Sequence, residues 1–205
     1  MSWFLAALGA YLLGSIPNGY LVGKAHGVDL RKVGSNNIGA TNALRVLGKK
    51  WGYFVFATDA LKGWAGVMLA WVIGWNWPET AKISLGVVGA ISVMIGHIFP
   101  VWLGFKGGKG ISTSAGVMIA LFPIWVFLFG LSMWGLFFFT TRYVSVASIA
   151  SAISLAVGSG ILWAMGHCDA IRTGIAAAMC LLAVWRHKPN IQRLLAGTEK
   201  KFEKK

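Results

Sequence analysis

The chain has few charged residues. Asp, Glu, Lys and Arg make up 12% of its 205 residues, and only six residues are acidic. Soluble domains usually carry about twice that share of charge. Hydrophobic residues account for 57% of the sequence, and eleven residues are tryptophan. The composition therefore excludes an ordinary soluble domain and indicates an integral membrane protein.

Cysteine is also scarce. The two cysteines, Cys168 and Cys180, fall on one predicted helix, where helical rise would separate them by about 18 Å. They cannot form a disulfide with each other within that helix. The four histidines are scattered and no CxxC motif occurs. The sequence offers no metal-ligand spacing, and we expect neither a metal nor a cofactor.

Long hydrophobic runs fill most of the sequence. A helix needs about 20 apolar residues to cross the hydrocarbon core, and Pro123 divides one run that is too long for a single span. The fourth segment is short and could be tilted, kinked or partly re-entrant. Residues 1–205 leave little room for a soluble domain, so we expect one all-α polytopic transmembrane domain. About seven transmembrane helices are predicted, at Ser2–Val22, Trp51–Trp75, Ala81–Val101, Ile111–Phe122, Pro123–Thr141, Val144–Met165 and Ile171–Trp185.

Basic residues are concentrated in alternate connections. The positive-inside rule then predicts an external N-terminus and a cytoplasmic C-terminus. No basic residue precedes the first span, which is the reverse of a cleaved signal peptide. We attribute the net charge of +13 to topology and attraction to membrane lipids, and expect no nucleic acid partner. Sixteen of the nineteen basic residues lie on the predicted cytoplasmic side, namely Lys24, Arg31, Lys32, Arg45, Lys49, Lys50, Lys106, Lys109, Arg142, Arg186, Lys188, Arg193, Lys200, Lys201, Lys204 and Lys205.

Three polar segments rich in glycine or basic residues lie between the hydrophobic runs on this predicted side. They are Gly34–Gly48, Gly96–Thr113 and Arg186–Lys200. Glycine allows backbone N–H groups to crowd around an anion, and Lys and Arg supply countercharge. The pattern predicts a site for a phosphorylated substrate.

The first segment offers small polar side chains followed by Arg45. If Ala40–Leu47 is a helix, its N-terminus and the preceding amides could hold a phosphate. A simple Gly/Asn turn between two helices is the alternative. The candidate residues here are Ser35, Asn37, Gly39, Thr41, Asn42 and Arg45.

The second segment packs glycines and lysines before Thr113. Its spacing is not that of a Walker A loop, so nucleotide hydrolysis is unsupported. A positively charged membrane anchor with flexible glycines is the alternative, and His97 could be structural or catalytic. The candidate residues are Lys106, Gly107, Gly108, Lys109, Gly110 and Thr113.

A third group joins Arg142 and Ser145 to the tail residues His187 and Asn190. Ser145 and Ser148 are one helical turn apart, and helix packing is the alternative reading of both. We expect Glu199 to pair with a loop arginine and not to act as a base. Within the second span, Asp59 and Lys62 share a helix face and are expected to form a salt bridge that ties this helix end to a motif loop.

These segments carry a family resemblance. GSIPNGYLVGK, GSNNIGATNALRVLG, GHIFPVWLGFKGGKGIST, RYVSVASI and RHKPNIQRLLAGTEKK, in that order from Gly14 to Lys201, resemble the bacterial acyl-phosphate-dependent glycerol-3-phosphate acyltransferases of the PlsY type. One departure is Asn36, where the family often has glycine. Asparagine tolerates a left-handed backbone better than most residues.

The resemblance implies a seven-span enzyme of the bacterial cytoplasmic (inner) membrane with its active site facing the cytoplasm. Its partners would be glycerol 3-phosphate, acyl phosphate and membrane lipids. The expected products are lysophosphatidic acid (1-acylglycerol 3-phosphate) and phosphate, in the first acylation step of phospholipid synthesis. A transporter for a phosphorylated anion and a structural lipid-binding protein are the competing classes.

Roles are carried over by motif. Catalytic roles fall on Ser35, Arg45, Lys106, Ser145, His187 and Asn190. The phosphates would be bound by Asn37, Gly39, Thr41, Asn42, Gly107, Gly108, Lys109, Gly110, Thr113 and Arg142, with no metal. The cytoplasmic loops contain no paired carboxylates and no Ser-His-Asp order, which disfavours a covalent acyl-enzyme. Either His187 or the donor's own phosphate could accept the proton.

Overall fold

The computed structural model describes residues 1–202, and this part of the chain is helical without strands. Lys204 and Lys205 of the predicted cytoplasmic tail lie outside this range. The chain divides into two compact units, Met1–Leu121 and the residues from Phe122 onward. The expectation of one domain stays a prediction.

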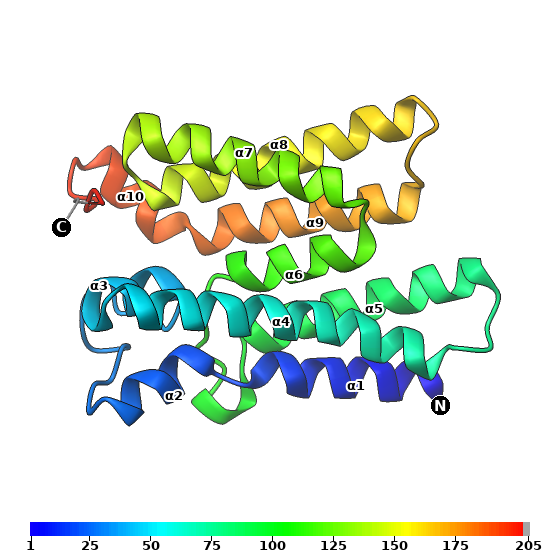
Figure 1. Ribbon diagram of the computed structural model, residues 1–205, viewed down its shortest axis with the longest axis horizontal. Coiled ribbons are helices and arrows are strands. Elements are labelled where there is room, and N and C mark those ends of the chain that lie inside the picture. Colours follow the sequence, from blue (N-terminus) through cyan, green and yellow to red (C-terminus); the bar gives the residue numbers. More distant parts are fainter. Residues whose placement is uncertain (203–205) are drawn as a thin grey trace. The chain divides into compact units, whose positions relative to one another are not determined.

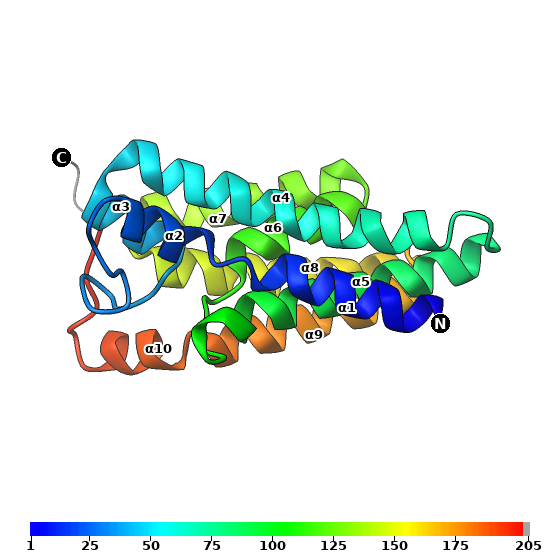
Figure 2. The same cartoon turned by 90° about the horizontal axis from the view of Figure 1, so that it is seen from below.

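The first unit is built on α4 (Lys49–Ile73) and α5 (Glu79–Ile98). Helix α1 (Ser2–Ser15) packs on both, and α6 (Ile111–Leu121) packs mainly on α4 (Figure 1). The short helices α2 (Asn18–Ala25) and α3 (Ala40–Leu47) gather at the N-terminal end of α4 (Figure 2). The 3-10 turn η1 (Val101–Leu103) follows α5.

The second unit contains α7 (Ile124–Thr141), α8 (Val144–Ala164), α9 (Ala170–Arg186) and α10 (Lys188–Leu195). Helix α8 packs between α7 and α9, and α10 follows α9 after a single residue, His187. Pro123 precedes α7 as its N-cap, so the predicted division of the long apolar run at this proline is confirmed.

Within residues 1–202, five helical segments are long and apolar enough to cross a membrane: Ser2–Ala25, Lys49–Ile73, Glu79–Leu103, Ile124–Thr141 and Val144–Ala164. The fourth and seventh predicted spans correspond to α6, with 11 residues, and α9, with 17. Helix α6 falls short of the length of an ordinary span, and α9 is at the lower end of that range. The all-helical polytopic fold is therefore confirmed, while the number of seven spans stays a prediction.

The first span is interrupted, which the predicted continuous segment Ser2–Val22 did not include. Pro17 has no N–H to continue the helix, and the residue before a proline is pushed out of the helical region. Ile16 accordingly has extended torsion angles, and α2 starts at Asn18. The interruption leaves backbone carbonyls that need partners inside an apolar protein.

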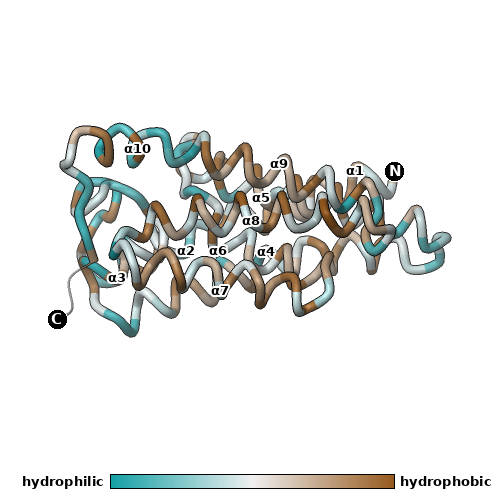
Figure 3. Tube along the Cα trace, turned by 90° about the horizontal axis from the view of Figure 1, so that it is seen from above, coloured by the Kyte–Doolittle hydropathy of each residue, from teal (hydrophilic) through white to brown (hydrophobic). Residues whose placement is uncertain are grey.

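Small residues bring the helices of the first unit into close contact. A methyl group on Gly116 of α6 would overlap the carbonyl of Ala60, and one on Gly63 of α4 would overlap that of Thr113. Such contacts are typical of membrane helices, where backbone approach replaces the hydrophobic driving force. Figure 3 shows the complementary pattern, with apolar helices and hydrophilic connections. Large apolar side chains such as Phe139 and Leu181 are 72% exposed, as expected for surfaces that face lipid.

Candidate active site

The loop before α3 is organised around the side-chain amide of Asn42. Its Nδ2 donates to the carbonyls of Leu30, Val33 and Asn37 at 2.8–3.0 Å. Its Oδ1 accepts from the backbone N–H of Ser35 at 2.8 Å. Asn42 is only 1% exposed. It therefore holds the shape of the loop, and its contact with a phosphate stays a prediction.

Two residues of this loop have left-handed backbones. Gly34 has φ +67°, and Asn36 has φ +56°. Few residues other than glycine and asparagine adopt this region at low cost. The expectation that asparagine sustains the loop at position 36 agrees with this conformation.

Residues Ala40–Leu47, which the sequence allowed as a helix, form α3 with these bounds. Gly39 is its N-cap, and the N–H of Gly39 donates to Oδ1 of Asn37 at 2.8 Å. Ser35 is exposed, whereas Thr41 and Arg45 are half-buried. Arg45 lies in the last turn of α3. Gly39 and Arg45 thus lie at opposite ends of the same short helix.

The second segment turns back onto the end of α5. The N–H of Gly107 donates to the carbonyl of Ile98 at 3.0 Å, and that of Gly108 to the carbonyl of His97 at 3.2 Å. A methyl group on Gly107 would overlap the carbonyl of His97, and one on Gly108 would overlap the ring of His97. These glycines therefore serve a close backbone approach, and their amides already have acceptors.

The lysines of this segment differ in exposure. Lys106 is exposed and Lys109 is half-buried. Gly110 has φ +86° and leads into α6, where Thr113 is fully buried against Gly63 of α4. The segment thus presents an exposed cation, Lys106, on a backbone that is held at both ends.

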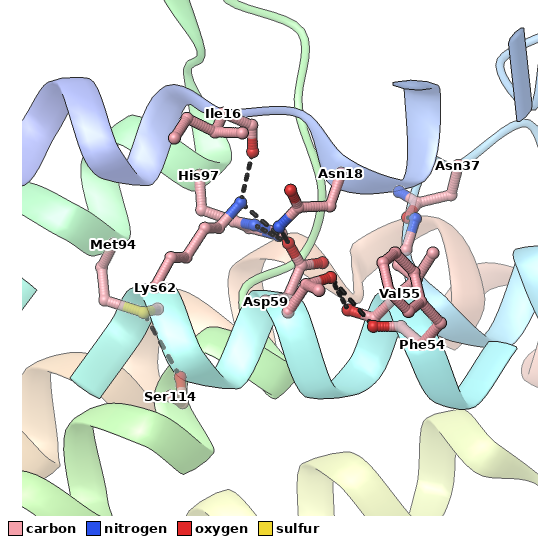
Figure 4. Close-up of polar contacts among 12 residues, drawn as sticks. Ile16, Asn18, Asn37, Phe54, Val55, Asp59, Lys62, Met94, His97 and Ser114 are labelled. Atoms are coloured by element: carbon pink, nitrogen blue, oxygen red, sulfur yellow. Dashed lines mark hydrogen bonds and ion pairs between the residues drawn. The ribbon is translucent and has the colours of Figure 1, made fainter. Parts of the chain in front are cut away.

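A buried polar network connects α2, α4 and α5, the helices next to both segments (Figure 4). The predicted Asp59–Lys62 salt bridge is confirmed, with Nζ 2.8 Å from Oδ1. Nδ2 of Asn18 donates to the same Oδ1 at 3.0 Å, and Nδ1 of His97 lies 3.8 Å from it. Lys62 also donates to the carbonyl of Ile16 at 2.7 Å. Asp59, Lys62 and His97 are each at most 6% exposed.

In the second unit, Glu199 bonds to three residues from two helices, α8 and α10. Its Oε1 accepts from Ser145 Oγ at 2.9 Å and from Asn190 Nδ2 at 2.6 Å, and its Oε2 accepts from Arg193 Nε at 2.7 Å. Burial alone would raise the pKa of Glu199, but the hydrogen bonds from Asn190, Arg193 and Ser145 together outweigh it and lower that pKa. The expected pairing of Glu199 with an arginine is confirmed.

His187 occupies the junction between α9 and α10 and is buried. Its Nδ1 lies 2.7 Å from the carbonyl of Ala183. A carbonyl can only accept, so Nδ1 carries the hydrogen. In a neutral ring, Nε2 is then the nitrogen with a free electron pair for a proton or a donor.

The remaining residues of this group lie near the α7–α8 turn. Arg142 is the C-cap of α7 with φ +62°, and its carbonyl accepts from the N–H of Phe202 at 2.8 Å. Ser148 accepts from the indole N–H of Trp134 at 3.3 Å, which is the packing role weighed for this serine. Arg142 and Ser145 are thus tied to the tail of the same unit.

The structure brings the candidates together in two groups, one in each unit. The first and second segments share the end of the first unit that also holds the buried network, and Ser145, Asn190 and Glu199 form a hydrogen-bonded set in the second. Sequence reasoning did not single out Asn18. Its position directly after Pro17, at the start of a helix opposite Asp59, was the available signal.

Comparison with known proteins assigns the family. Residues 4–197 match the family model described as glycerol-3-phosphate acyltransferase. The chain belongs to the glycerol-3-phosphate acyltransferase family. The predicted family is therefore confirmed. The prediction of an integral membrane acyltransferase of phospholipid synthesis is confirmed with it.

Relatives of the acyltransferase cover nearly its whole length. The glycerol-3-phosphate acyltransferase of Trichlorobacter lovleyi is 44% identical over 197 residues, which is 95% of each chain. That of Allorhizobium ampelinum is 40% identical over 196 residues, covering 95% of this chain and 90% of the relative.

Solved structures of PlsY, described as an integral membrane glycerol 3-phosphate acyltransferase, are also similar. Its glycerol 3-phosphate form has a TM-score of 0.88 and 39% identity, and its lysophosphatidic acid form has a TM-score of 0.85 and 38% identity. Each comparison covers 99% of the acyltransferase chain and 96% of the solved chain.

Proposed function

We propose that this chain transfers a fatty acyl group from acyl phosphate to glycerol 3-phosphate, releasing lysophosphatidic acid and phosphate. The observation that carries the proposal is the similarity, over 99% of the chain, to a PlsY solved in forms with this acceptor and this product. The acyl phosphate donor follows from the resemblance of the three polar segments to the PlsY type.

Both substrates are phosphorylated, so the site needs two sets of cationic or N–H donors. Arg45 on α3 and Lys106 after η1 are suited to the phosphate of glycerol 3-phosphate. Arginine binds phosphate through two parallel hydrogen bonds, and lysine acts as a point charge. The half-buried Lys109 and Arg142, together with Ser35, Asn37, Gly39 and Thr41, are assigned to the phosphates as well.

The reaction joins the acceptor hydroxyl oxygen to the acyl carbonyl carbon and breaks the bond from that carbon to the donor phosphate. The hydroxyl proton leaves with the phosphate. An acyl phosphate is already activated, so orientation and charge stabilisation are the main contributions required of the protein. A serine nucleophile is disfavoured, because Ser145 donates to Glu199, whose lowered pKa makes it too weak a base to activate a hydroxyl.

We assign His187 to orientation and the donor phosphate to proton acceptance. The hydrogen bond from Nδ1–H to the carbonyl of Ala183 fixes the ring of His187, and so fixes the direction of Nε2. The phosphate oxygens of the donor lie beside the carbonyl under attack and are basic near neutral pH. This choice is tested by the His187 variants described below.

We further propose that the enzyme resides in the bacterial cytoplasmic membrane as one functional domain with seven spans. The polar segments and the tail would face the cytoplasm and the N-terminus the outside. The asymmetry of Lys and Arg between alternate connections supports this orientation.

The direct test is to supply purified protein in detergent with acyl phosphate and labelled glycerol 3-phosphate. We expect a labelled lipid to form with stoichiometric phosphate release, and a chelator to leave the rate unchanged. Turnover with acyl-CoA alone would overturn the assignment of the donor. Uptake of label into vesicles without any new lipid would favour a transporter.

A further inference from the structure

The buried network in the first unit links the supports of the two glycine-rich segments. We name Asn18, Asp59, Lys62 and His97 the α4 clamp. Asn18 from α2 and Lys62 from α4 bond to one atom, Oδ1 of Asp59, and Nδ1 of His97 from α5 lies 3.8 Å from it. Figure 4 shows Lys62 reaching from this carboxylate to the carbonyl of Ile16.

On one side the clamp fixes the break in the first span. Lys62 donates to the carbonyl of Ile16, before Pro17, and Asp59 holds Asn18 on the other side of that proline. Helix α2 then packs directly on the first segment, since a methyl group on Gly19 would overlap the carbonyl of Ile38. The direction of α2 is thereby transmitted to the loop that precedes Arg45.

On the other side the clamp fixes the second segment. The ring of His97 faces Asp59 through Nδ1, and its opposite edge, at Nε2, meets the backbone of Gly108. The carbonyl of His97 accepts the N–H of Gly108. Lys106 and Lys109 therefore stand on a backbone whose position depends on this histidine.

The burial of a charged pair here needs a reason other than stability. Removing two charges from water is costly, and replacement of a buried ion pair by apolar residues is often neutral or stabilising. Asp59 is 2% exposed and Lys62 is 6% exposed. Their hydrogen bonds go to the residues that flank the helix break, which apolar substitutes could not hold.

We propose that Asp59, Lys62, Asn18 and His97 are positioning residues that set the spacing between Arg45 and Lys106, and so determine the affinity for the phosphate of glycerol 3-phosphate. This inference rests on the proposed function, since it takes these two cations as the acceptor site. None of the four is assigned a contact with substrate.

The test compares two variants with a matched control. Asn18→Ala removes one hydrogen bond to Asp59 and leaves the ion pair in place. The double variant Asp59→Asn with Lys62→Met removes both charges together, so that neither is left buried alone. Thr58→Ala is the control, because Thr58 lies beside Asp59 on α4 but bonds only to the carbonyls of Phe54 and Val55 in its own helix.

Each variant is checked by its thermal unfolding midpoint in detergent. The KM for each substrate and kcat are then measured, together with the affinity for glycerol 3-phosphate by calorimetry without donor. For Asn18→Ala we expect the KM for glycerol 3-phosphate to rise about 3- to 10-fold, the effect of one hydrogen bond. For the double variant we expect the affinity for glycerol 3-phosphate to fall about 100-fold, because misplacement of a binding group by about 1 Å has an effect of this size. Thr58→Ala should match the parent.

Parental KM and affinity in folded Asn18→Ala and in the folded double variant would overturn the proposal, and so would a change in midpoint alone. If the double variant does not fold, Asn18→Ala decides. If the parent binds glycerol 3-phosphate but forms no lipid, the proposed function fails, while the calorimetric comparison still tests the clamp.

Discussion

Arg45 and Lys106 carry the sharpest prediction at the scale of single residues. A charge-assisted hydrogen bond contributes about 1.5–3 kcal/mol, so Arg45→Ala and Lys106→Ala should each lower the rate at limiting glycerol 3-phosphate by roughly 10- to 150-fold. Lys32→Ala serves as control, because Lys32 is an exposed basic residue of the loop outside α3. Near-parental rates for both site variants would remove them from the acceptor site.

His187 separates two routes for the proton. Glutamine keeps some hydrogen-bonding capacity but does not titrate. If the donor phosphate takes the proton, His187→Gln should retain more activity than His187→Ala, and its pH–rate profile should still follow the donor phosphate. Two equally inactive variants that fold and bind both substrates would instead identify His187 as the base.

Glu199 makes the second unit sensitive to acid. Its pKa is lowered in the folded protein, so its contribution to stability is complete above the unfolded value of 4.5 and is lost as the pH falls through the lower folded value. Thermal unfolding of the parent should show this loss, and Glu199→Gln should show a smaller pH dependence. Glu79→Gln, at an exposed position at the start of α5, should leave the parental dependence intact.

At the scale of elements, the contact between α4 and α6 depends on Gly116. A methyl group there would overlap the carbonyl of Ala60, whereas one on Gly160 of α8 would meet nothing within 4 Å. Gly116→Ala should therefore destabilise the protein by about 1–3 kcal/mol through overpacking. Gly160→Ala should be neutral or stabilise it by about 0.5–1 kcal/mol. Similar unfolding midpoints for the two variants would contradict the close approach.

Helix positions were largely predictable because apolar runs and prolines mark them. The bounds of α3 and the start of α7 after Pro123 agree with the sequence. The interruption at Pro17 was missed, since the run Ser2–Val22 is long and apolar enough to be read as one span. The carbonyl of Ile16 at this break bonds to Lys62, which is 46 residues away along the chain. No local sequence pattern reveals such a distant partner.

The segments that carry the candidate residues could be located from the sequence, but the contacts of each residue could not. Asn42 was predicted as a phosphate ligand, which stays a prediction, and the structure adds that its amide bonds to the loop backbone. Gly107 and Gly108 were expected to offer N–H groups, and these donate to the end of α5. Composition identifies residue types that suit a phosphate, whereas the division between ligands and supports depends on contacts in three dimensions.

At the scale of the whole molecule, the charge asymmetry predicts the topology. A reporter fused after Lys205, beyond the described residues, and a cysteine placed in the turn at Trp77 should report opposite sides of the membrane. Intact cells and inverted vesicles, labelled with an impermeant reagent, provide the two reference states. Labelling of both positions from one side would contradict an odd number of spans.

The break at Ile16–Pro17 also bears on how the protein is made. The carbonyl of Ile16 finds its ammonium partner only on α4, which is synthesised after the whole of α2 and α3. Until then the carbonyl of Ile16 has the N–H of Asn18 as its partner but lacks the ammonium group, and the polar break of the first span would face hydrocarbon. We therefore expect the first and second spans to leave the translocation channel together, so that Lys62 and Asp59 bond to the residues around the break before lipid surrounds them.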